Sequence, residues 1–216
     1  MGRVMRDLAM WQLGEPVTER RERYLPVPPG RHVLAWVLVA LVAILSTPAV
    51  GQPAATDLLG TLNLSGYPPG TKPPDFGGRT AEGETVSLAG LQGRVVLLTF
   101  WATWCQECRP EMPMFEQLHR ELAVQGFTVL GINVREGRRA IQQYARELGL
   151  TFPLVLDPSG AIQVSYGVIG LPTTFLIGRD GRAVALAIGP RDWSTAQVRA
   201  LIEALLAEPA ARKGAR

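Results

Sequence analysis

Residues 94–113, RVVLLTFWATWCQECRPEMP, decide the fold of this chain. The beginning of the stretch, RVVLLTFW, is almost continuously apolar, a pattern typical of a strand that is buried on both faces. Cys105 and Cys108 follow shortly after it, and Met112 is the first of several apolar residues at helical spacing. The stretch therefore predicts a buried strand, a segment with two cysteines and a helix in direct succession.

Strand and helix patterns alternate through the rest of the sequence up to residue 206. The expected elements are a short strand over 84–88 before the cysteines and, after them, a helix over 112–122, a strand over 127–134, a helix over 140–148, a strand over 152–156, a hairpin of strands 174–177 and 183–188, and a helix over 198–205. Ser194 and Gln197 form a capping box before the last helix. Parallel units followed by an antiparallel hairpin predict an α/β fold, in which a mixed central sheet has helices on both faces.

The spacing Cys-x-x-Cys allows three interpretations: half of a metal site, a structural bridge or a redox-active pair. Zinc takes four ligands, and apart from the cysteines this chain offers only His32 and His119. A bridge across so short a loop constrains the unfolded chain little, so it would add little stability. We therefore interpret Cys105 and Cys108 as a redox-active disulfide pair, and we expect no metal and no other cofactor.

The position of the pair between a strand and a helix indicates what each sulfur does. A thiolate at a helix N-terminus is favoured by the unpaired N–H groups there. We expect Cys105 to be the exposed nucleophile, and Cys108, one turn further in, to be the more buried thiol that attacks the mixed disulfide. Beside the nucleophile, an exposed indole of Trp104 would give the substrate an apolar contact surface.

Four segments resemble the thioredoxin family, and more closely its membrane-anchored TlpA/ResA-like branch: FWATWC at 100–105, CRPEMP at 108–113, FPLVLD at 152–157 and GLPTTFLI at 170–177. The resemblance covers about residues 73–206. It implies a thioredoxin fold and a protein thiol-disulfide oxidoreductase that exchanges a dithiol for a disulfide at Cys105 and Cys108. It also implies that Pro172 is a cis-proline facing the cysteines, and that backbone near Leu171 pairs with an extended substrate.

Two departures from ordinary thioredoxin affect the expected proton transfer. Thr99 stands where that protein carries a buried aspartate, and Gln106-Glu107 replaces Gly-Pro between the cysteines. Glu111 matches a glutamate characteristic of the ResA-like branch, so we expect it to take the proton of Cys108 as that thiol attacks. The alternative is that Glu111 is a solvated acid in the first turn of the helix.

An uncharged apolar segment, VLAWVLVALVAILSTPAV at residues 33–50, precedes the domain. At about 1.5 Å per residue, a helix of this length is just long enough to span a bilayer. Arginines at positions 20, 21, 23 and 31 lie shortly before the segment, and no basic residue follows it before Lys72, so the positive-inside rule places residues 1–32 in the cytoplasm and the cysteines outside. We expect an uncleaved transmembrane anchor; the alternative is a signal peptide that is cleaved near Ala49-Val50-Gly51.

The remaining segments and the charge complete the predicted organisation. Residues 51–72 are rich in Gly, Pro, Ser and Thr and predict a linker; residues 73–206 form the thioredoxin-like domain, and residues 207–216 a flexible C-terminal tail. The chain has a formal charge of +3, but its domain has twelve arginines against thirteen acidic residues. A nucleic-acid-binding domain concentrates positive charge on its folded surface, so we expect no nucleic-acid partner.

These features predict a membrane-bound, extracytoplasmic dithiol reductase. The resemblance implies a disulfide-containing protein substrate such as apocytochrome c, whose haem-attachment cysteines it would keep reduced, and a membrane thiol-disulfide electron donor. One alternative is a thioredoxin-fold peroxidase, although such relatives typically carry Thr where this chain has Ala102. Another is a copper-delivery module whose thiols bind Cu(I), although such relatives pair Cys-x-x-x-Cys with a downstream histidine and none follows His119.

Overall fold

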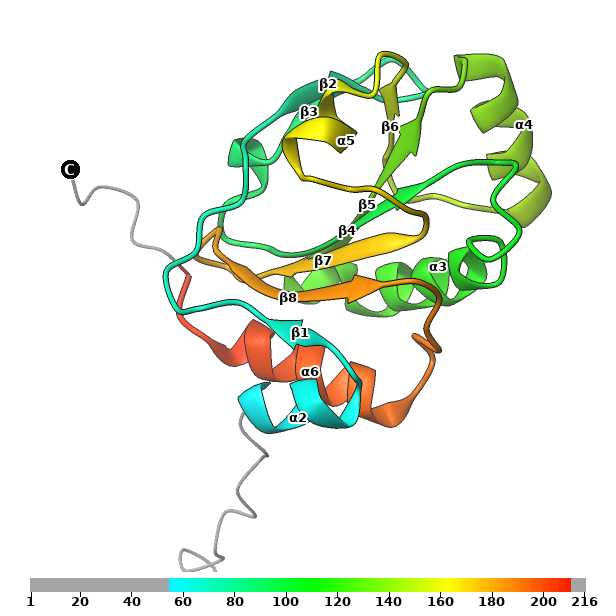
Figure 1. Ribbon diagram of the computed structural model, residues 1–216. Coiled ribbons are helices and arrows are strands. Elements are labelled where there is room, and N and C mark those ends of the chain that lie inside the picture. Colours follow the sequence, from blue (N-terminus) through cyan, green and yellow to red (C-terminus); the bar gives the residue numbers. More distant parts are fainter. Residues whose placement is uncertain (1–54, 211–216) are drawn as a thin grey trace, which may run out of the picture. The chain divides into compact units, whose positions relative to one another are not determined.

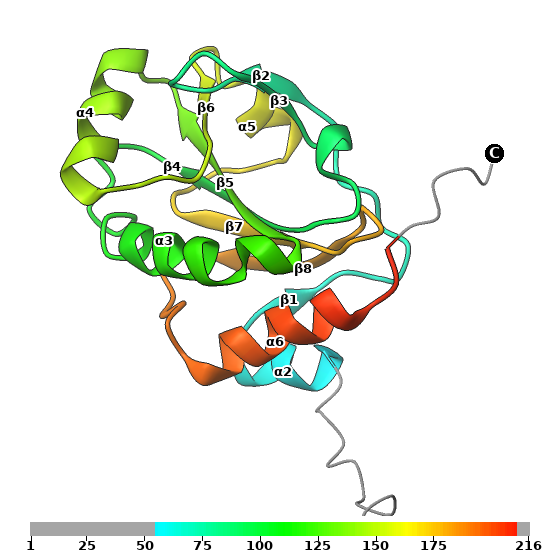
Figure 2. The same cartoon turned by 180° about the vertical axis from the view of Figure 1, so that it is seen from behind.

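A six-stranded mixed sheet forms the centre of the domain (Figures 1 and 2). The computed structural model describes residues 55–210. The strands are β1 (Ser65–Gly66), β2 (Gly77–Arg79), β3 (Thr85–Ser87), β4 (Val95–Trp101), β5 (Phe127–Val134), β6 (Leu154–Asp157), β7 (Thr173–Ile177) and β8 (Ala183–Ile188). The helices are α2 (Ala55–Thr61), α3 (Glu111–Leu122), α4 (Arg138–Leu148), α5 (Ala161–Ser165) and α6 (Ala196–Ala207), with 3-10 turns η1 (Ala89–Leu91) and η2 (Ala123–Gln125).

The strand order in the main sheet is β1-β8-β7-β4-β5-β6, and β2 and β3 form a separate hairpin. Strands β4, β5 and β6 are parallel, whereas β7 is antiparallel to β4 and β8 is antiparallel to β7. This arrangement confirms the prediction of parallel units followed by an antiparallel hairpin. It places the carboxyl end of β4, from which the cysteine segment leaves, between the ends of β5 and β7.

Strand β4 lies at the centre of the sheet and is buried along its whole length. Its side chains alternate between the two faces, with Leu97 and Trp101 in one core and Leu98 and Phe100 in the other. Each fully buried side chain of this kind stabilises the fold by about 1.5–3 kcal/mol. The continuous apolar run therefore reflects burial on both faces, as the sequence predicted.

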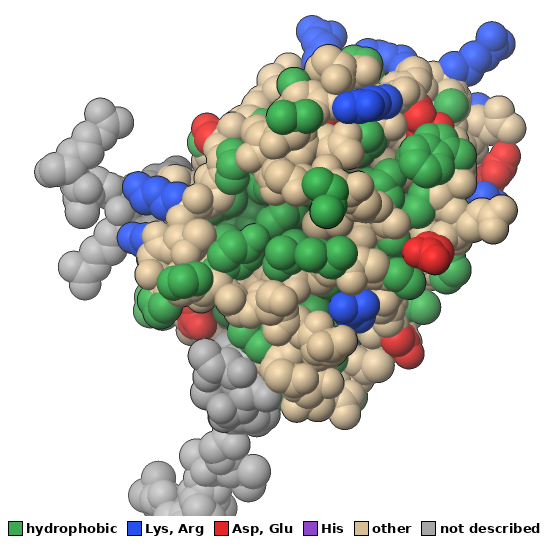
Figure 3. Space-filling model, viewed as in Figure 1, with side chains coloured by type: hydrophobic (Ala, Val, Ile, Leu, Met, Phe, Trp, Pro, Cys, Tyr) green, Lys and Arg blue, Asp and Glu red, His purple; other side chains and the backbone are tan. Residues whose placement is uncertain are grey.

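The two faces of the sheet carry separate cores, with helices on both sides. The first core packs α2, α3, α4 and α6 against one face, for example through Phe115 and Leu201. The second core lies on the opposite face and includes Phe76, with Tyr166 next to α5 packed against it. Figures 1 and 2 show α5 and α3 on opposite sides of the sheet. Figure 3 shows apolar side chains gathered near the middle of the face seen in Figure 1.

Both edges of the main sheet have short neighbours. At one edge, the two residues of β1 pair with β8, Ser65 opposite Leu186 and Gly66 opposite Ala185. At the other edge, Thr80 forms an isolated antiparallel bridge with Val155 of β6. Two segments that precede the cysteines, at β1 and at Thr80, thus lie along the two edges of the sheet.

The prediction of a linker over residues 51–72 is wrong for much of that range. Helix α2 and strand β1 belong to the folded domain, because α2 packs on α6 and β1 extends the sheet. Leu58 is buried in the first core, and Leu62 and Leu64 pack against it. The Gly, Pro, Ser and Thr content of the segment concealed this short cluster of leucines.

Two details of the second half of the domain also differ from the sequence analysis. Helix α5 was not expected; it follows Gly160, whose φ of 73° is readily adopted by glycine. The N-cap of α6 is Thr195, whose hydroxyl accepts the Val198 N–H, and Ser194 does not fill this role. Ser194 instead donates its N–H and its hydroxyl to the Asp192 carboxylate.

The predicted cytoplasmic tail at 1–32 and the predicted anchor or signal segment at 33–50 lie outside the described residues. Among residues 55–210, no helix is both long enough and apolar enough to cross a membrane. Helix α6 ends at Ala207, so the domain extends one residue beyond the predicted boundary.

Candidate active site

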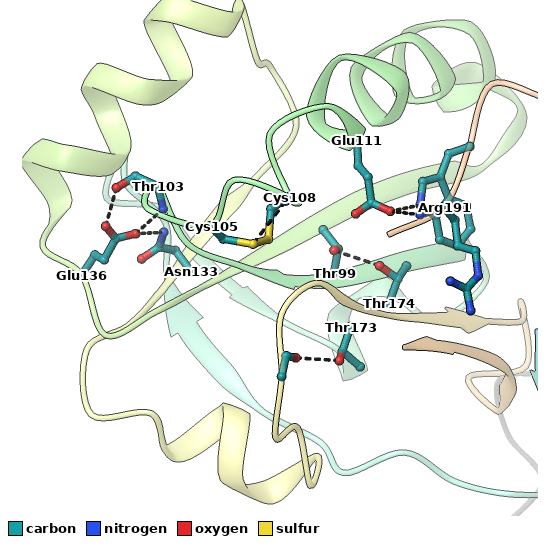
Figure 4. The surroundings of a disulfide bond; sticks show 12 residues. Thr99, Thr103, Cys105, Cys108, Glu111, Asn133, Glu136, Thr173, Thr174 and Arg191 are labelled. Atoms are coloured by element: carbon teal, nitrogen blue, oxygen red, sulfur yellow. Dashed lines mark hydrogen bonds between the residues drawn. A yellow bond between two sulfur atoms is a disulfide. The ribbon is translucent and has the colours of Figure 1, made fainter. Parts of the chain in front are cut away.

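Cys105 and Cys108 form a disulfide in the segment that joins β4 to α3 (Figure 4). The segment folds into successive turns: the N–H of Cys105 donates to Ala102, that of Cys108 to Cys105, and that of Glu111 to Cys108, at 3.1–3.2 Å. Helix α3 begins only at Glu111, so the pair precedes the helix, whereas the sequence analysis placed it at the helix start. The reason is that residues 105–110 bond in i to i−3 turns before the α-helical pattern begins.

A backbone N–H nevertheless reaches the first sulfur. The N–H of Cys108 lies 3.2 Å from Sγ of Cys105 and is directed at it. A donor in this position favours the thiolate once the disulfide is reduced. The electrostatic support expected from a helix N-terminus is thus supplied by a turn.

The burial of the pair follows the predicted order. Cys108 is 0% exposed and Cys105 is 6% exposed, whereas the neighbouring Trp104 is 68% exposed. Cys105 is more covered in this disulfide form than the sequence analysis expected. The exposed indole of Trp104 agrees with its proposed role as an apolar contact for substrate.

Glu111 is buried, so the alternative of a solvated acid is wrong. Its Oε1 accepts the Arg191 backbone N–H at 2.8 Å and the Trp193 indole N–H at 2.7 Å. Burial raises the pKa of Glu111 to about 7, against the opposing effects of these two hydrogen bonds and of the Arg191 charge. A carboxyl with this pKa can take up or release a proton near neutral pH.

Thr99 lies in a neutral part of the same site. The Thr174 hydroxyl donates to the Thr99 hydroxyl oxygen at 2.9 Å, and both residues are buried between β4 and β7. The position at which thioredoxin carries an aspartate is therefore occupied by a pair of hydroxyl groups. The titratable buried carboxyl of this site is that of Glu111, which lies beyond Cys108 (Figure 4).

A second carboxylate holds the beginning of the cysteine segment. Glu136 accepts hydrogen bonds from the N–H of Thr103 at 2.7 Å, from the Thr103 hydroxyl, and from the Asn133 side-chain amide at 2.7 Å. The preceding residue, Arg135, has a φ of 62°, which is uncommon for a residue other than glycine. Glu136 was not identified from the sequence; the one available signal was the polar Asn133 in a buried strand.

Leu171 and Pro172 lie at the same end of the sheet as the cysteines. The peptide bond between them is cis, as predicted. The next residue, Thr173, pairs with Phe100, close to the end of β4. Figure 4 shows the loop before Thr173 passing near the disulfide. Trp104, Leu171 and Pro172 therefore border the same site from two segments that are distant in sequence.

An open groove of about 480 Å³ lies beside Glu111 on the side of α3. It is lined by Glu107, Pro110, Glu111, Met114, Pro190, Arg191 and Asp192. The loop between β8 and α6 forms one wall of the groove. This loop was not recognised from the sequence as part of the site, although the loop supplies both hydrogen-bond donors to Glu111.

Known proteins are similar to this chain in sequence and in fold. The AhpC/TSA family matches residues 69–185. ResA thiol-disulfide oxidoreductases are similar in sequence: that of Geobacillus thermodenitrificans is 38% identical over 120 residues, which are 56% of this chain and 69% of the relative. That of Bacillus subtilis is 34% identical over 120 residues, which are 56% of this chain and 67% of the relative.

Solved structures show the same fold. A thiol:disulfide interchange protein of the thioredoxin family from Chlorobium tepidum has a TM-score of 0.58 at 31% identity, covering 66% of this chain and 99% of that one. StoA from Bacillus subtilis has a TM-score of 0.51 at 28% identity, covering 61% and 96%. The thioredoxin-like fold implied by the resemblance is thereby confirmed. The chain therefore belongs to the AhpC/TSA family, and it is a ResA-like thiol-disulfide oxidoreductase.

Proposed function

We propose that this enzyme works outside the cytoplasm as a dithiol reductase of partner proteins, with disulfides such as that of apocytochrome c as substrates. The proposed direction rests on the resemblance to the ResA-like branch; the observation that supports exchange chemistry at this pair is the buried Glu111 carboxyl, whose pKa is raised to about 7 by burial. A base of this strength suits removal of the Cys108 proton at neutral pH. That proton must leave when Cys108 attacks, which is the step that completes reduction of a substrate.

The reaction starts with the enzyme in its dithiol form. The Cys105 thiolate attacks one sulfur of the substrate disulfide, which breaks and releases the first substrate thiolate. Cys108 then passes its proton to Glu111, attacks Sγ of Cys105 and expels the second substrate thiolate. Two electrons and two protons pass to the substrate in total, because each expelled thiolate is protonated by solvent or by Glu111. The enzyme is left with the Cys105–Cys108 disulfide that the structure contains.

The proposed substrate-binding residues are Trp104, Leu171 and Pro172. The exposed indole offers an apolar surface next to Cys105, and the segment before β7 offers backbone groups for an extended chain. Such a surface suits a peptide segment better than a small solute, since extended peptides bind through backbone hydrogen bonds with side chains in flanking contacts.

The proposed location follows from the N-terminal sequence. Residues 33–50 would anchor the chain in the cell membrane, with the catalytic domain on the periplasmic or outer side. A membrane thiol-disulfide electron donor would return the disulfide to the dithiol. Protease added to intact spheroplasts should digest the catalytic domain while leaving a cytoplasmic marker intact. Protection of the domain would contradict this orientation.

The reduction potential of the full-length chain tests the proposed direction. Equilibration with a glutathione redox buffer should give a value close to that of thioredoxin, about −270 mV, rather than close to that of a dedicated disulfide former, about −120 mV. A second assay uses an oxidised peptide with the haem-attachment sequence Cys-x-x-Cys-His. The dithiol enzyme should reduce this peptide faster than a scrambled peptide with the same disulfide. An oxidising potential would overturn the proposed direction.

A further inference from the structure

The two oxygens of the Glu111 carboxyl have different surroundings. Oε1 accepts two hydrogen bonds, from the Arg191 backbone N–H at 2.8 Å and from the Trp193 indole N–H at 2.7 Å. Oε2 is buried and has no hydrogen-bond partner among the described residues. Leaving a buried acceptor without a donor costs about 1–3 kcal/mol, and more when the group is charged. This asymmetry indicates that Oε2 is left open to bind a proton.

The two donors differ in what holds them. The Trp193 side chain is 4% exposed, and its ring lies 5.4 Å from that of Phe115, one turn further along α3 than Glu111. The other donor is a backbone N–H, which side-chain rotation cannot remove. Arg191 and Trp193 come from the loop between β8 and α6, about 80 residues after Glu111 in the sequence. The Trp193 donor is therefore held in position by its packing before any proton moves.

The arrangement makes one oxygen a better proton acceptor than the other. A proton on Oε1 would have to displace one of the two N–H donors, because that oxygen already accepts both. A proton on Oε2 displaces nothing. Figure 4 shows the carboxyl of Glu111 between the cysteine segment and Arg191, with the Oε1 bonds directed to the Arg191 side. The free oxygen thus lies on the side away from the donors.

We propose that Arg191 and Trp193 are positioning residues, which hold Oε1 of Glu111 so that Oε2 is the atom that exchanges the proton with Cys108. The inference rests on the proposed function of Glu111 as the proton acceptor and assigns that function to one atom. In the forward step the S–H bond of Cys108 breaks and an O–H bond forms at Oε2. The electron pair left on Cys108 forms the new bond to Sγ of Cys105, while the substrate sulfur takes the electron pair of the bond that breaks.

The charged and polar groups near Glu111 come from three segments. Glu107 of the cysteine segment and Arg191 and Asp192 of the loop before α6 line the same groove as Glu111. The groups that β4 and β7 supply, Thr99 and Thr174, are neutral hydroxyls. Of these groups, Arg191 and the two N–H donors favour the carboxylate, whereas burial opposes it. Loss of the Trp193 donor should therefore shift the Glu111 titration to higher pH.

The test follows the two steps of thiol exchange separately. Reduced full-length enzyme is mixed in a stopped-flow instrument with one equivalent of dithiobis(nitrobenzoate), whose released aromatic thiolate absorbs visible light. The first release reports attack by Cys105, and the second reports attack by Cys108. In the wild type, the rate of the second release should rise with pH through a midpoint near the Glu111 pKa of about 7.

Trp193→Phe removes the indole N–H while keeping an aromatic ring against Phe115. The midpoint of the second release should move upward by about one pH unit, the equivalent of one hydrogen bond to a charged group. Glu111→Gln should abolish the inflection, and the double variant should match Glu111→Gln alone. If Glu111→Gln keeps the inflection, the proton role of Glu111 itself fails. If Trp193→Phe leaves the midpoint unchanged while Glu111→Gln abolishes the inflection, the positioning role fails and the proton role stands.

A second measurement needs no change at Trp193, so it serves even if that variant does not fold. In 15N-labelled wild-type enzyme, the Trp193 indole N–H and the Arg191 amide N–H should shift together with pH, at one midpoint. Both shifts should disappear in Glu111→Gln. Titration of either signal at a different midpoint, or its persistence in Glu111→Gln, would overturn the inference.

Discussion

Thr103, two residues before Cys105, donates both its backbone N–H and its hydroxyl to the carboxylate of Glu136. Glu111, three residues after Cys108, is held in turn by Arg191 and Trp193. The cysteine segment is therefore fixed at both ends by a carboxylate. The two ends differ in chemistry, because burial raises the pKa of Glu111 to about 7, whereas Glu136 accepts three hydrogen bonds in a less buried position.

Glu136→Gln should destabilise the domain by about 2 kcal/mol, because the amide cannot accept all the hydrogen bonds that Thr103 and Asn133 donate to the carboxylate. Urea denaturation of the disulfide form measures the change. Glu147→Gln is the matched control: its ion pair with Arg109, at 3.7 Å, is half exposed, so its loss should cost less than about 0.5 kcal/mol. Equal effects of the two substitutions would contradict a special role of Glu136.

Glu111→Gln should change how stability depends on pH. A carboxyl whose pKa is raised from 4.5 to about 7 on folding favours the folded state most below its unfolded pKa, and this contribution is lost as the pH rises through 7. Between pH 4.5 and about 7, the free energy of unfolding of the wild type should therefore fall by about 3 kcal/mol relative to that of Glu111→Gln. Urea titrations at several pH values measure it; parallel curves for the two proteins would disprove the raised pKa.

Cys108→Ser and Cys105→Ser should behave differently toward a protein disulfide. Cys105 is 6% exposed and Cys108 is 0% exposed, so only Cys105 is placed to attack an external sulfur. Cys108→Ser should accumulate a mixed disulfide, which non-reducing gels and mass spectrometry detect, because no second thiol is present to release it. Cys105→Ser should form such an adduct at least about tenfold more slowly. Trapping at equal rates would reverse the assignment of the two thiols.

Trp104→Ala should reduce kcat/KM for a protein disulfide strongly and the rate with a small aromatic disulfide much less. The two reductions should differ by about tenfold. The exposed indole can contact a chain that extends beyond the sulfur atoms, and such an aromatic contact is worth about 1–2 kcal/mol. Trp104→Phe should restore most of the loss, since it restores an aromatic surface. Equal losses for both substrates would mean that Trp104 acts on the cysteines and not on the substrate.

Leu58→Ala should destabilise the domain by about 2–3 kcal/mol, because Leu58 is the buried contact between α2 and the first core. Thermal and urea denaturation measure the effect. Val124→Ala removes an apolar group that is 93% exposed and should change stability by less than about 0.5 kcal/mol. A neutral Leu58→Ala would support the original expectation of a linker in this part of the chain.

The sequence predicted those parts of the fold that carry strong local patterns. The apolar runs gave β4 and β5, and Gly149 ended α4 at the expected residue, where it adopts a φ of 64°. The segment around α2 was missed because its few leucines become meaningful only against α6, far along the chain. Short elements of this kind depend on tertiary contacts for their stability, so local periodicity says little about them.

The residues of the site fall into the same two groups, those that a local sequence motif reveals and those that only tertiary contacts reveal. Cys105, Cys108 and Pro172 could be found from motifs, since each lies in a segment with a recognisable sequence. The partners that tune the site could not, because Glu136 meets Thr103 across 33 residues and Trp193 meets Glu111 across 82. No periodicity links residues at such distances, and only the folded chain brings them together.

The short pairings at the two edges of the sheet limit how this protein can associate with other chains. An exposed edge strand is a template for edge-to-edge aggregation, but β1 offers only two residues and the far edge is occupied in part by the bridge from Thr80 to Val155. An added Cβ at Gly78 would lie 2.5 Å from the Val155 side chain, which shows how closely the chain approaches β6 there. Self-assembly by strand addition is disfavoured at both edges.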